Sequence, residues 1–155
     1  MYYREMGLPT VSVRWYNVYG PNQGFHCQKA VPFFIRWALR NKDIEVWGDG
    51  TQTVDLIHAI DTVRATIIIA NTKKFEGQTI DIGAGEETSV NSLAELIIRK
   101  SKSASKIIYL PMRAGESEHT YLKANTTELR KLNFKYLYDL DRGIEETVDW
   151  YKKNM

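Results

Sequence analysis

The sequence predicts an α/β fold, because short β-branched or apolar segments alternate with stretches whose apolar residues recur at helical spacing. Strands are expected at residues 10–13, 44–47, 79–82 and 107–110. Of the 155 residues, 43% are hydrophobic, which is enough for one domain with a substantial core. We therefore expect residues 1–155 to form a single α/β domain.

Charge and cysteine content exclude several functional classes. The 21 basic and 19 acidic side chains leave a net charge of +2, which is too balanced to predict nucleic-acid binding. The single cysteine, Cys27, excludes an internal disulfide and suits a cytoplasmic protein. His26 and Cys27 have no further ligand at metal spacing, so no metal site is expected. No apolar run approaches the roughly 18 residues that predict a membrane-spanning helix.

The amino-terminal elements lead to a polar and aromatic segment. Residues 1–6 resemble the last turns of a helix, and residues 10–13 form a β-branched strand. Tyr19-Gly20-Pro21-Asn22 should end the extended chain, because Pro21 lacks an N–H and Gly20 accepts unusual dihedral angles. Open α/β sheets bind ligands at the carboxyl ends of their strands, so residues 14–23 are a candidate site. The alternative is an ordinary strand exit whose aromatic side chains pack inward.

Two elements are predicted next. An amphipathic helix should carry Pro32 in its first turn and present one apolar face, made of Val31, Phe34, Ile35, Ala38 and Leu39. Residues 44–47 and 51–57 flank Asp49-Gly50, a pairing typical of a β-hairpin. A phosphate-binding glycine loop is less favoured there, because such glycines open a helix, whereas these are expected to join strands.

The second half alternates strands and helices. A helix capped by Asp61 or Thr62 should run through Val63, Ile67 and Ala70 and end near Asn71. After strand 79–82 comes a helix capped by Ser92, with capping-box spacing to Glu95, or by Ser89 one turn earlier. The apolar stripe of this helix comprises Leu93, Leu96 and Ile97. A final helix should be capped by Asp139 or Asp141, and its apolar stripe comprises Ile144, Val148 and Tyr151. A short helix is expected at 126–132.

Residues 112–120 carry the charged side chains best suited to a ligand. Arg113 offers planar, permanently charged donors that suit an anionic ligand, and Glu116 offers carboxylate acceptors for donor groups. The alternative is a solvent-exposed ion pair of little consequence. His58 and His119 are isolated in sequence and fit surface or hydrogen-bonded roles better than catalytic ones.

Five motifs in register resemble extended short-chain dehydrogenases/reductases, the NAD-dependent nucleotide-sugar epimerases and dehydratases. They are Arg14-Trp-Tyr-Asn-Val-Tyr-Gly-Pro-Asn-Gln23, Val46-Trp-Gly-Asp-Gly-Thr-Gln-Thr53, Ile82-Gly-Ala-Gly-Glu86, Arg113-Ala-Gly-Glu116, and Gly143-Ile144 with Trp150-Tyr151. The likeness covers only the carboxyl-terminal, substrate-binding portion of such an enzyme. It implies one or two residual Rossmann strands and the absence of an amino-terminal NAD-binding Rossmann domain.

The resemblance implies a substrate-binding site made of Asn17, Trp47, Gln52, Arg113 and Glu116. In the family, an arginine at the Arg113 position holds the diphosphate, an acid at the Glu116 position holds the ribose, and an aromatic residue at the Trp47 position lies near the base. Trp47 packing on the hairpin face is the alternative. This chain departs from the family at Val54, where a second diphosphate-binding arginine is usual. A charge-assisted hydrogen bond is worth roughly 1.5–3 kcal/mol, so weak nucleotide binding is expected.

Catalytic machinery is missing from the sequence. The chain contains neither a glycine-rich dinucleotide fingerprint nor Tyr-x-x-x-Lys, in which the lysine lowers the tyrosine pKa. We expect a nucleotide-sugar-binding part that neither binds NAD or NADP nor turns over alone, although the complete enzyme would use one of them. UDP- or dTDP-linked sugars are the expected ligands, and a homo-oligomer or a separate amino-terminal Rossmann chain is the expected assembly. The alternative is a non-catalytic interaction or oligomerisation module that has lost the ligand.

Overall fold

The structure, a computed structural model, describes residues 2–27, 29–115 and 120–155. Its helices are α1 (Tyr2–Met6), α2 (Ala30–Ala38), α3 (Ala59–Ala70), α4 (Val90–Ser101), α5 (Thr127–Lys131) and α6 (Leu140–Asn154), with 3₁₀ turns at Phe25–Cys27 and Lys73–Phe75. Its strands are β1 (Ser12–Trp15), β2 (Asn17–Tyr19), β3 (Ile44–Trp47), β4 (Thr53–Val54), β5 (Leu56–His58), β6 (Thr79–Ile82), β7 (Thr88–Ser89) and β8 (Ile107–Leu110). The predicted α/β class is confirmed.

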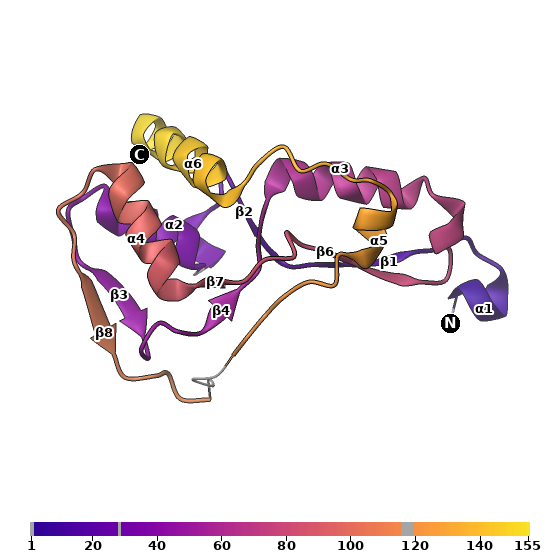
Figure 1. Cartoon of the computed structure of the whole chain (residues 1–155), viewed down its shortest axis with the longest axis horizontal. Coiled ribbons are helices and arrows are strands. Elements are labelled where there is room, and N and C mark those ends of the chain that lie inside the picture. The colour runs from indigo at the N-terminus through magenta and orange to yellow at the C-terminus, as the bar shows by residue number, and fades with distance from the viewer. Residues whose placement is uncertain (1, 28, 116–119) are drawn as a thin grey trace.

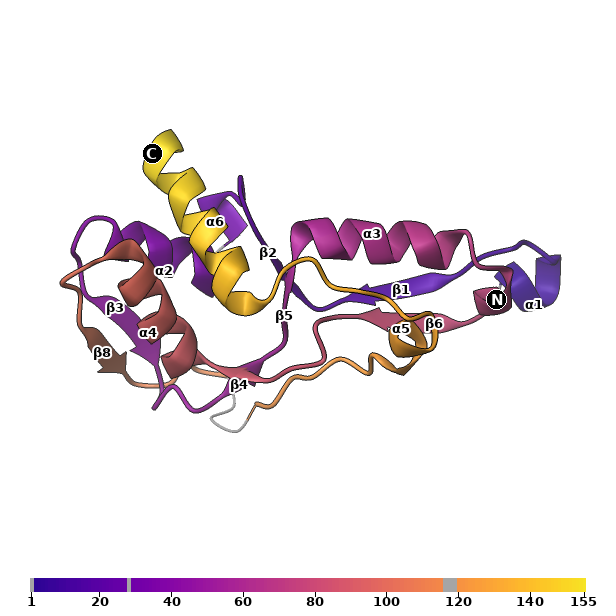
Figure 2. The ribbon, with the colours of Figure 1, turned by 45° about the horizontal axis from the view of Figure 1, so that its top comes forward.

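One end of the elongated molecule is built on the parallel pair β1–β6 (Figure 1). The register runs from Ser12 opposite Thr79 to Trp15 opposite Ile82. The second, turned view also places α3 along this pair (Figure 2). Ala65 and Ile69 of α3 belong to the same buried cluster as Ile80 and Ile82 of β6. Strand 79–82 forms at the predicted residues, whereas the first strand forms two residues later than expected and is mostly exposed.

At the other end, α2, α4 and α6 pack beside the parallel pair β3–β8 (Figures 1 and 2). All three predicted apolar stripes contribute to one core. The buried members are Val31, Phe34, Ile35, Ala38, Leu93, Leu96, Ile97, Ile144, Val148 and Tyr151. Two of the alternative caps are now decided: the Ser89 and Asp139 side chains accept from the backbone N–H groups of Ser92 and Arg142, at 3.1 and 2.8 Å.

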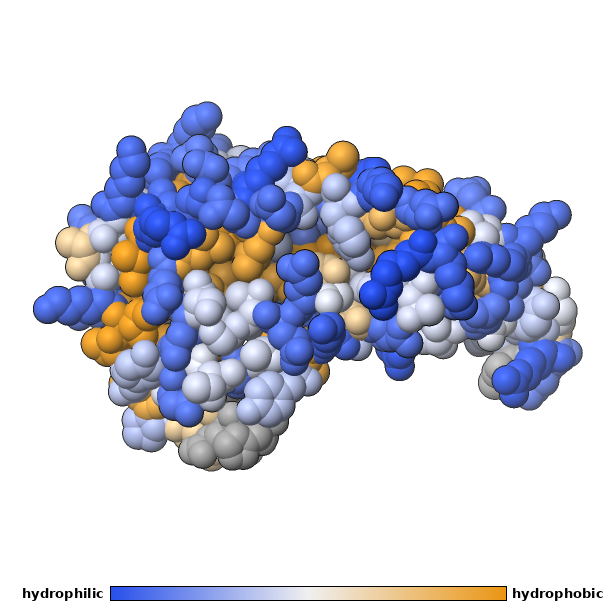
Figure 3. Space-filling view, in the orientation of Figure 1, coloured by the Kyte–Doolittle hydropathy of each residue, from blue (hydrophilic) through white to orange (hydrophobic). Residues whose placement is uncertain are grey.

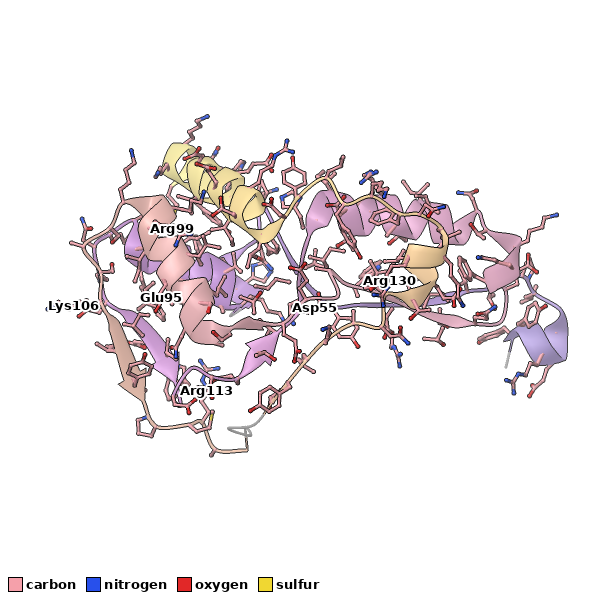
Figure 4. The ribbon with its side chains drawn as sticks, in the orientation of Figure 1. Asp55, Glu95, Arg99, Lys106, Arg113 and Arg130 are labelled. Atoms are coloured by element: carbon pink, nitrogen blue, oxygen red, sulfur yellow. The ribbon has the colours of Figure 1, made fainter. Side chains whose placement is uncertain are left out.

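Asp55 joins the two ends near the middle of the chain's fold (Figure 4). The residue is fully buried between β4 and β5, and its carboxylate accepts backbone N–H groups of Ala84, Gly85 and Ala124 at 2.7, 2.8 and 2.9 Å. These donors come from two segments distant in sequence. A buried carboxylate without such donors would be strongly destabilising, so this triple contact fixes how the segments meet.

The predicted hairpin at 44–57 is wrong. β3 pairs in parallel with β8, while β4 pairs antiparallel with β7. A type I′ hairpin needs positive φ at two consecutive residues, but here Gly48 and Gly50 have positive φ and Asp49, between them, does not. Asp49 instead accepts from the backbone N–H and hydroxyl of Thr51, at 2.9 and 2.7 Å. This turn directs the chain away from β3 toward β7.

The predicted start of α3 is also wrong, whereas its end near Asn71 is confirmed. The N-cap is His58, whose Nδ1 accepts from the Ile60 N–H at 3.4 Å. Asp61 is fully buried inside the first turn, because its carboxylate accepts the N–H groups of residues 137 and 138, each at 3.0 Å. The face of α3 that points into the protein therefore carries a polar side chain, Asp61, in the first helical turn. Val63 and Ile67 lie on the outward face of α3 and are 56% and 57% exposed.

Candidate functional site

A cavity of about 320 Å³ lies between α2 and β3, and we call it the α2–β3 pocket. Periodicity explains its walls. Lys29, Phe33 and Trp37 line it at i, i+4 and i+8, the spacing of one helix face. On β3, Ile44 and Val46 point into the core, so the alternate residues Glu45 and Trp47 face the pocket. The remaining lining residues are Ala30, Phe34, Val46, Gln52, Val90 and Arg113.

The polar groups of the pocket gather around Trp47. The Arg113 guanidinium stacks over the Trp47 ring, with its central carbon 4.6 Å from a ring centroid. The Gln52 Nε2 donates to the Trp47 carbonyl at 2.8 Å, which leaves the buried Gln52 Oε1 without a hydrogen-bond partner among the described residues. The figure with side chains places Arg113 beside the ends of β3 and β8 (Figure 4). The pocket thus combines a cation, an aromatic face and an unpaired acceptor.

A smaller cavity of about 60 Å³ adjoins the α2–β3 pocket. Lys29, Ala30 and Val90 line both cavities, and Asn17 and Val54 line only the smaller one. The Asn17 Nδ2 donates weakly to the Asp55 carbonyl at 3.4 Å. Val54 packs against the main core, so an apolar side chain forms part of the wall of this smaller cavity.

Three of the five predicted site residues, Trp47, Gln52 and Arg113, meet in the α2–β3 pocket, and Asn17 lines the adjoining cavity. Glu116 and His119 lie outside the described residues. The proximity of Trp47 and Arg113 fits the ligand-facing interpretation of Trp47, because no hairpin exists for it to pack on. Their role in binding stays a prediction.

Sequence reasoning missed Lys29, Phe33, Trp37 and Glu45 as pocket residues. The helical spacing of the first three was readable, but the buried stripe Val31, Phe34, Ile35 and Ala38 dominated the interpretation of that helix. The alternation of β3 would have placed Glu45 beside Trp47. Only the packing of α2 on β3 shows which element faces them.

Two other groups with shifted pKa values lie away from this pocket. Burial raises the pKa of Asp81, but hydrogen bonds from Arg14, the Asn125 N–H and Tyr16 outweigh it, so the net pKa falls below its usual range. Burial lowers the pKa of His58, and the nearby Glu146 carboxylate, 3.4 Å from Nε2, partly opposes this. His58 stacks on Tyr138 with ring centroids 3.9 Å apart. His58 and Asp81 thus stabilise packed segments.

Among the described residues, no group of three or more His, Cys, Asp or Glu side chains is placed to hold a metal ion. In the same part of the chain, no helix combines the length and apolar character that crossing a bilayer requires.

The fold and the pocket together define an α/β protein with an aromatic-walled, cation-bearing cavity beside its helical end. The family model described as the NAD dependent epimerase/dehydratase family matches residues 1–83. The chain belongs to this family, and the resemblance noted in the sequence is confirmed.

Named relatives make the comparison more specific. UDP-N-acetyl-alpha-D-glucosaminuronate decarboxylase of Bacillus cytotoxicus is 34% identical over 97% of this chain and 49% of its own length. Pal from Bacillus thuringiensis superposes with a TM-score of 0.89 at 31% identity, over 99% of this chain and 49% of that structure. UDP-glucuronic acid 4-epimerase from Bacillus cereus, solved with UDP-glucuronic acid and NAD, superposes at 0.86 with 28% identity, over 99% and 48%. The chain therefore spans about half the length of the relatives it matches.

Proposed function

We propose that this chain is the nucleotide-sugar-binding part of an NAD(P)-dependent nucleotide-sugar epimerase or dehydratase. The observation that carries the proposal is the α2–β3 pocket, where Arg113 stacks on Trp47 beside the unpaired Gln52 Oε1. A nucleotide sugar offers a flat base, ribose hydroxyls and a diphosphate. The aromatic wall suits the base, the unpaired acceptor suits a hydroxyl, and the cations suit the diphosphate.

In this proposal, the diphosphate binds beside the two cationic side chains of the pocket, Arg113 and Lys29. Arg113 supplies planar paired donors, and Lys29 supplies a compact positive charge from the N-cap of α2. By family resemblance, Asn17, which lines the adjoining cavity, contacts the phosphate or the sugar. By family resemblance, Glu116 accepts from the ribose. Val54 supplies no donor, so this chain alone should bind UDP- or dTDP-linked sugars weakly.

We further propose that catalysis requires a Rossmann half that this chain does not contain. In the relatives, the matched region is about half of the protein, and several are NAD-linked enzymes by family or by bound cofactor. The complete enzyme would therefore bind NAD or NADP, whereas this chain alone would not. The one cysteine, Cys27, fits a cytoplasmic setting.

The surface near β1 supports an assembly with another chain. Within the described residues, β1 pairs only with β6, so one edge of β1 carries unpaired N–H and C=O groups. Beside it, Trp15 is 59% exposed and donates to Thr66 of α3 at 3.2 Å. The outer face of α3 adds Ile60, Val63, Ile67 and Ile68, all exposed. Figure 3 shows apolar residues in small separate groups along the upper edge of the molecule, over α3. A second copy, or a separate amino-terminal Rossmann chain, would cover them.

A non-catalytic interaction module is the second candidate function. Val54 favours it, because the wall that would hold a second cation is apolar. The two candidates differ in whether the pocket binds a nucleotide.

Calorimetric titration of the purified chain with UDP-glucose, dTDP-glucose, NAD and NADP separates the candidates. We expect weak binding of a nucleotide sugar, no binding of either dinucleotide, and loss of nucleotide-sugar binding in Arg113→Ala. Arg40→Ala, an exposed arginine outside the pocket, is the matched control and should bind as wild type does. No nucleotide-sugar binding by folded protein would favour the interaction module. Micromolar NAD binding would contradict the proposed division of labour.

A further inference from the structure

The turn at residues 48–51 joins two residues of the α2–β3 pocket, Trp47 and Gln52. Because the Gln52 Nε2 donates to the Trp47 carbonyl at 2.8 Å, the shape of this turn sets where the unpaired Gln52 Oε1 points. Gly48 and Gly50 both have positive φ, and glycine restricts the backbone less than any other residue does. The turn therefore needs contacts from outside to keep one shape.

Two backbone N–H groups at the start of α4 supply some of these contacts. The first N–H groups of a helix have no partner within the helix. In α4, the Val90 N–H donates to the Gln52 carbonyl at 3.1 Å, and the Asn91 N–H donates to the Gly50 carbonyl at 3.0 Å. Any residue except proline could make these bonds, so they do not depend on the side chain at position 91.

The Asn91 side chain makes two further hydrogen bonds that do depend on its chemistry. Its Nδ2 donates to the Asp49 carbonyl at 2.9 Å, and its Oδ1 accepts from the Tyr109 hydroxyl of β8 at 3.3 Å. A Cβ on Gly50 would overlap this amide, so only glycine lets the turn approach Asn91 so closely. An amide donates at one end and accepts at the other, which neither a carboxylate nor an alkyl side chain does. Asn91 thus connects the turn to both α4 and β8.

We propose that Asn91 is a positioning residue of the α2–β3 pocket, which it does not line itself. By fixing the turn at 48–51, it holds the Gln52 amide and the Trp47 ring in the arrangement that a nucleotide sugar meets. This inference rests on the proposed function and deepens it, because it adds a residue that acts on the ligand only through others. A polar group that is already ordered binds without a further loss of conformational freedom. Removing the Asn91 amide should therefore weaken UDP-glucose binding by about threefold to tenfold.

Calorimetric titration of Asn91 variants with UDP-glucose tests this role. Asn91→Ala removes both side-chain bonds, whereas Asn91→Asp keeps the shape and the acceptor but has no donor for the Asp49 carbonyl. Asn71→Ala is the matched control, because the Asn71 Nδ2 also donates to a backbone carbonyl, that of Ile67 at 2.8 Å, but at the end of α3 and outside the pocket. Both Asn91 variants should bind about threefold to tenfold more weakly than wild type, and Asn71→Ala should bind as wild type does.

Spectra of the ligand-free protein separate positioning from a general loss of stability. The side-chain amide signals of Gln52 in ¹⁵N-labelled protein, assigned by their disappearance in Gln52→Ala, report directly on the turn. Both Asn91 variants should shift these signals. Asn71→Ala should leave them in place, although it also loses a hydrogen bond.

Each contrary result has a distinct meaning. Gln52 signals that stay in place in both Asn91 variants would overturn the positioning role, whether or not the protein binds a nucleotide. Shifted signals with an unchanged UDP-glucose affinity would overturn the link from the turn to the pocket while leaving the proposed function intact. Absence of UDP-glucose binding to folded wild-type protein would overturn the proposed function and, with it, the effect of Asn91 on a ligand.

Discussion

Replacing Asp55 by asparagine should strongly destabilise the fold. The Asp55 Oδ2 accepts two backbone N–H groups, from Gly85 and Ala124, and Oδ1 accepts one, from Ala84. Asparagine keeps the shape but has one acceptor oxygen, so its NH₂ group must face at least one of these buried donors. Hydrogen bonds to charged groups are worth roughly 1.5–3 kcal/mol, and an unsatisfied buried donor costs roughly 1–3 kcal/mol. The expected loss is therefore about 3 kcal/mol or more.

Urea unfolding followed by circular dichroism measures this loss directly. Asp149→Asn is the matched control, because its ion pair with Lys152 lies on the surface and should contribute at most about 1 kcal/mol. A lower unfolding midpoint in Asp55→Asn with a normal midpoint in Asp149→Asn is expected. If Asp55→Asn unfolds within about 0.5 kcal/mol of wild type, the three-segment junction does not hold the fold as argued.

Three further predictions concern affinity, assembly and pH. Val54→Arg should strengthen UDP-glucose binding about tenfold by adding a cation to the cavity wall, and an unchanged affinity in folded variant protein would contradict the arrangement of that wall. Ile67→Glu should weaken self-association measured by light scattering, because it places a charge in the exposed apolar face of α3; wild-type protein that is monomeric at micromolar concentration would refute the assembly proposal. The lowered pKa of His58 means that unfolded chains take up a proton first, so stability should fall as pH drops below about 6.5 toward the folded pKa. His58→Gln should flatten that dependence in urea midpoints measured at about pH 7.5 and 5.5, and an equally steep dependence in the variant would assign it to other groups.

Local periodicity was sufficient for much of the fold. The stripes of α2, α4 and α6 were readable because their apolar residues recur every three or four positions and face one core. The strands at 79–82 and 107–110 were readable because they are apolar runs bounded by turn residues. These features depend only on near neighbours in sequence.

The errors arose where distant segments decide the local structure. Asp49-Gly50 looks like a hairpin turn, but β3 gains a parallel partner, β8, some sixty residues later. Asp61 looks like a helix cap, but it is used to bind the backbone of residues 137 and 138. Val63 and Ile67 are apolar yet exposed, and under the assembly proposal a partner chain covers them.

Only part of the candidate site was predictable from the sequence, and the cavity itself was not. Trp47, Gln52 and Arg113 came from family resemblance, and the structure shows that they share one pocket. Lys29 and Glu45 become pocket residues only because α2 packs across the face of β3. Pairing and packing of this kind cannot be deduced from composition or spacing.

Resonances of the four tryptophan indoles give the most direct test of the central claim. Trp37 and Trp47 line the α2–β3 pocket, while Trp15 lies on β1 and Trp150 on α6, outside it. Titration of UDP-glucose into ¹⁵N-labelled protein should therefore shift the Nε1–H signals of Trp37 and Trp47 and leave those of Trp15 and Trp150 in place. Single Trp→Phe variants assign each signal. Shifts confined to Trp15 or Trp150, or no shift at millimolar ligand, would contradict nucleotide-sugar binding in this pocket.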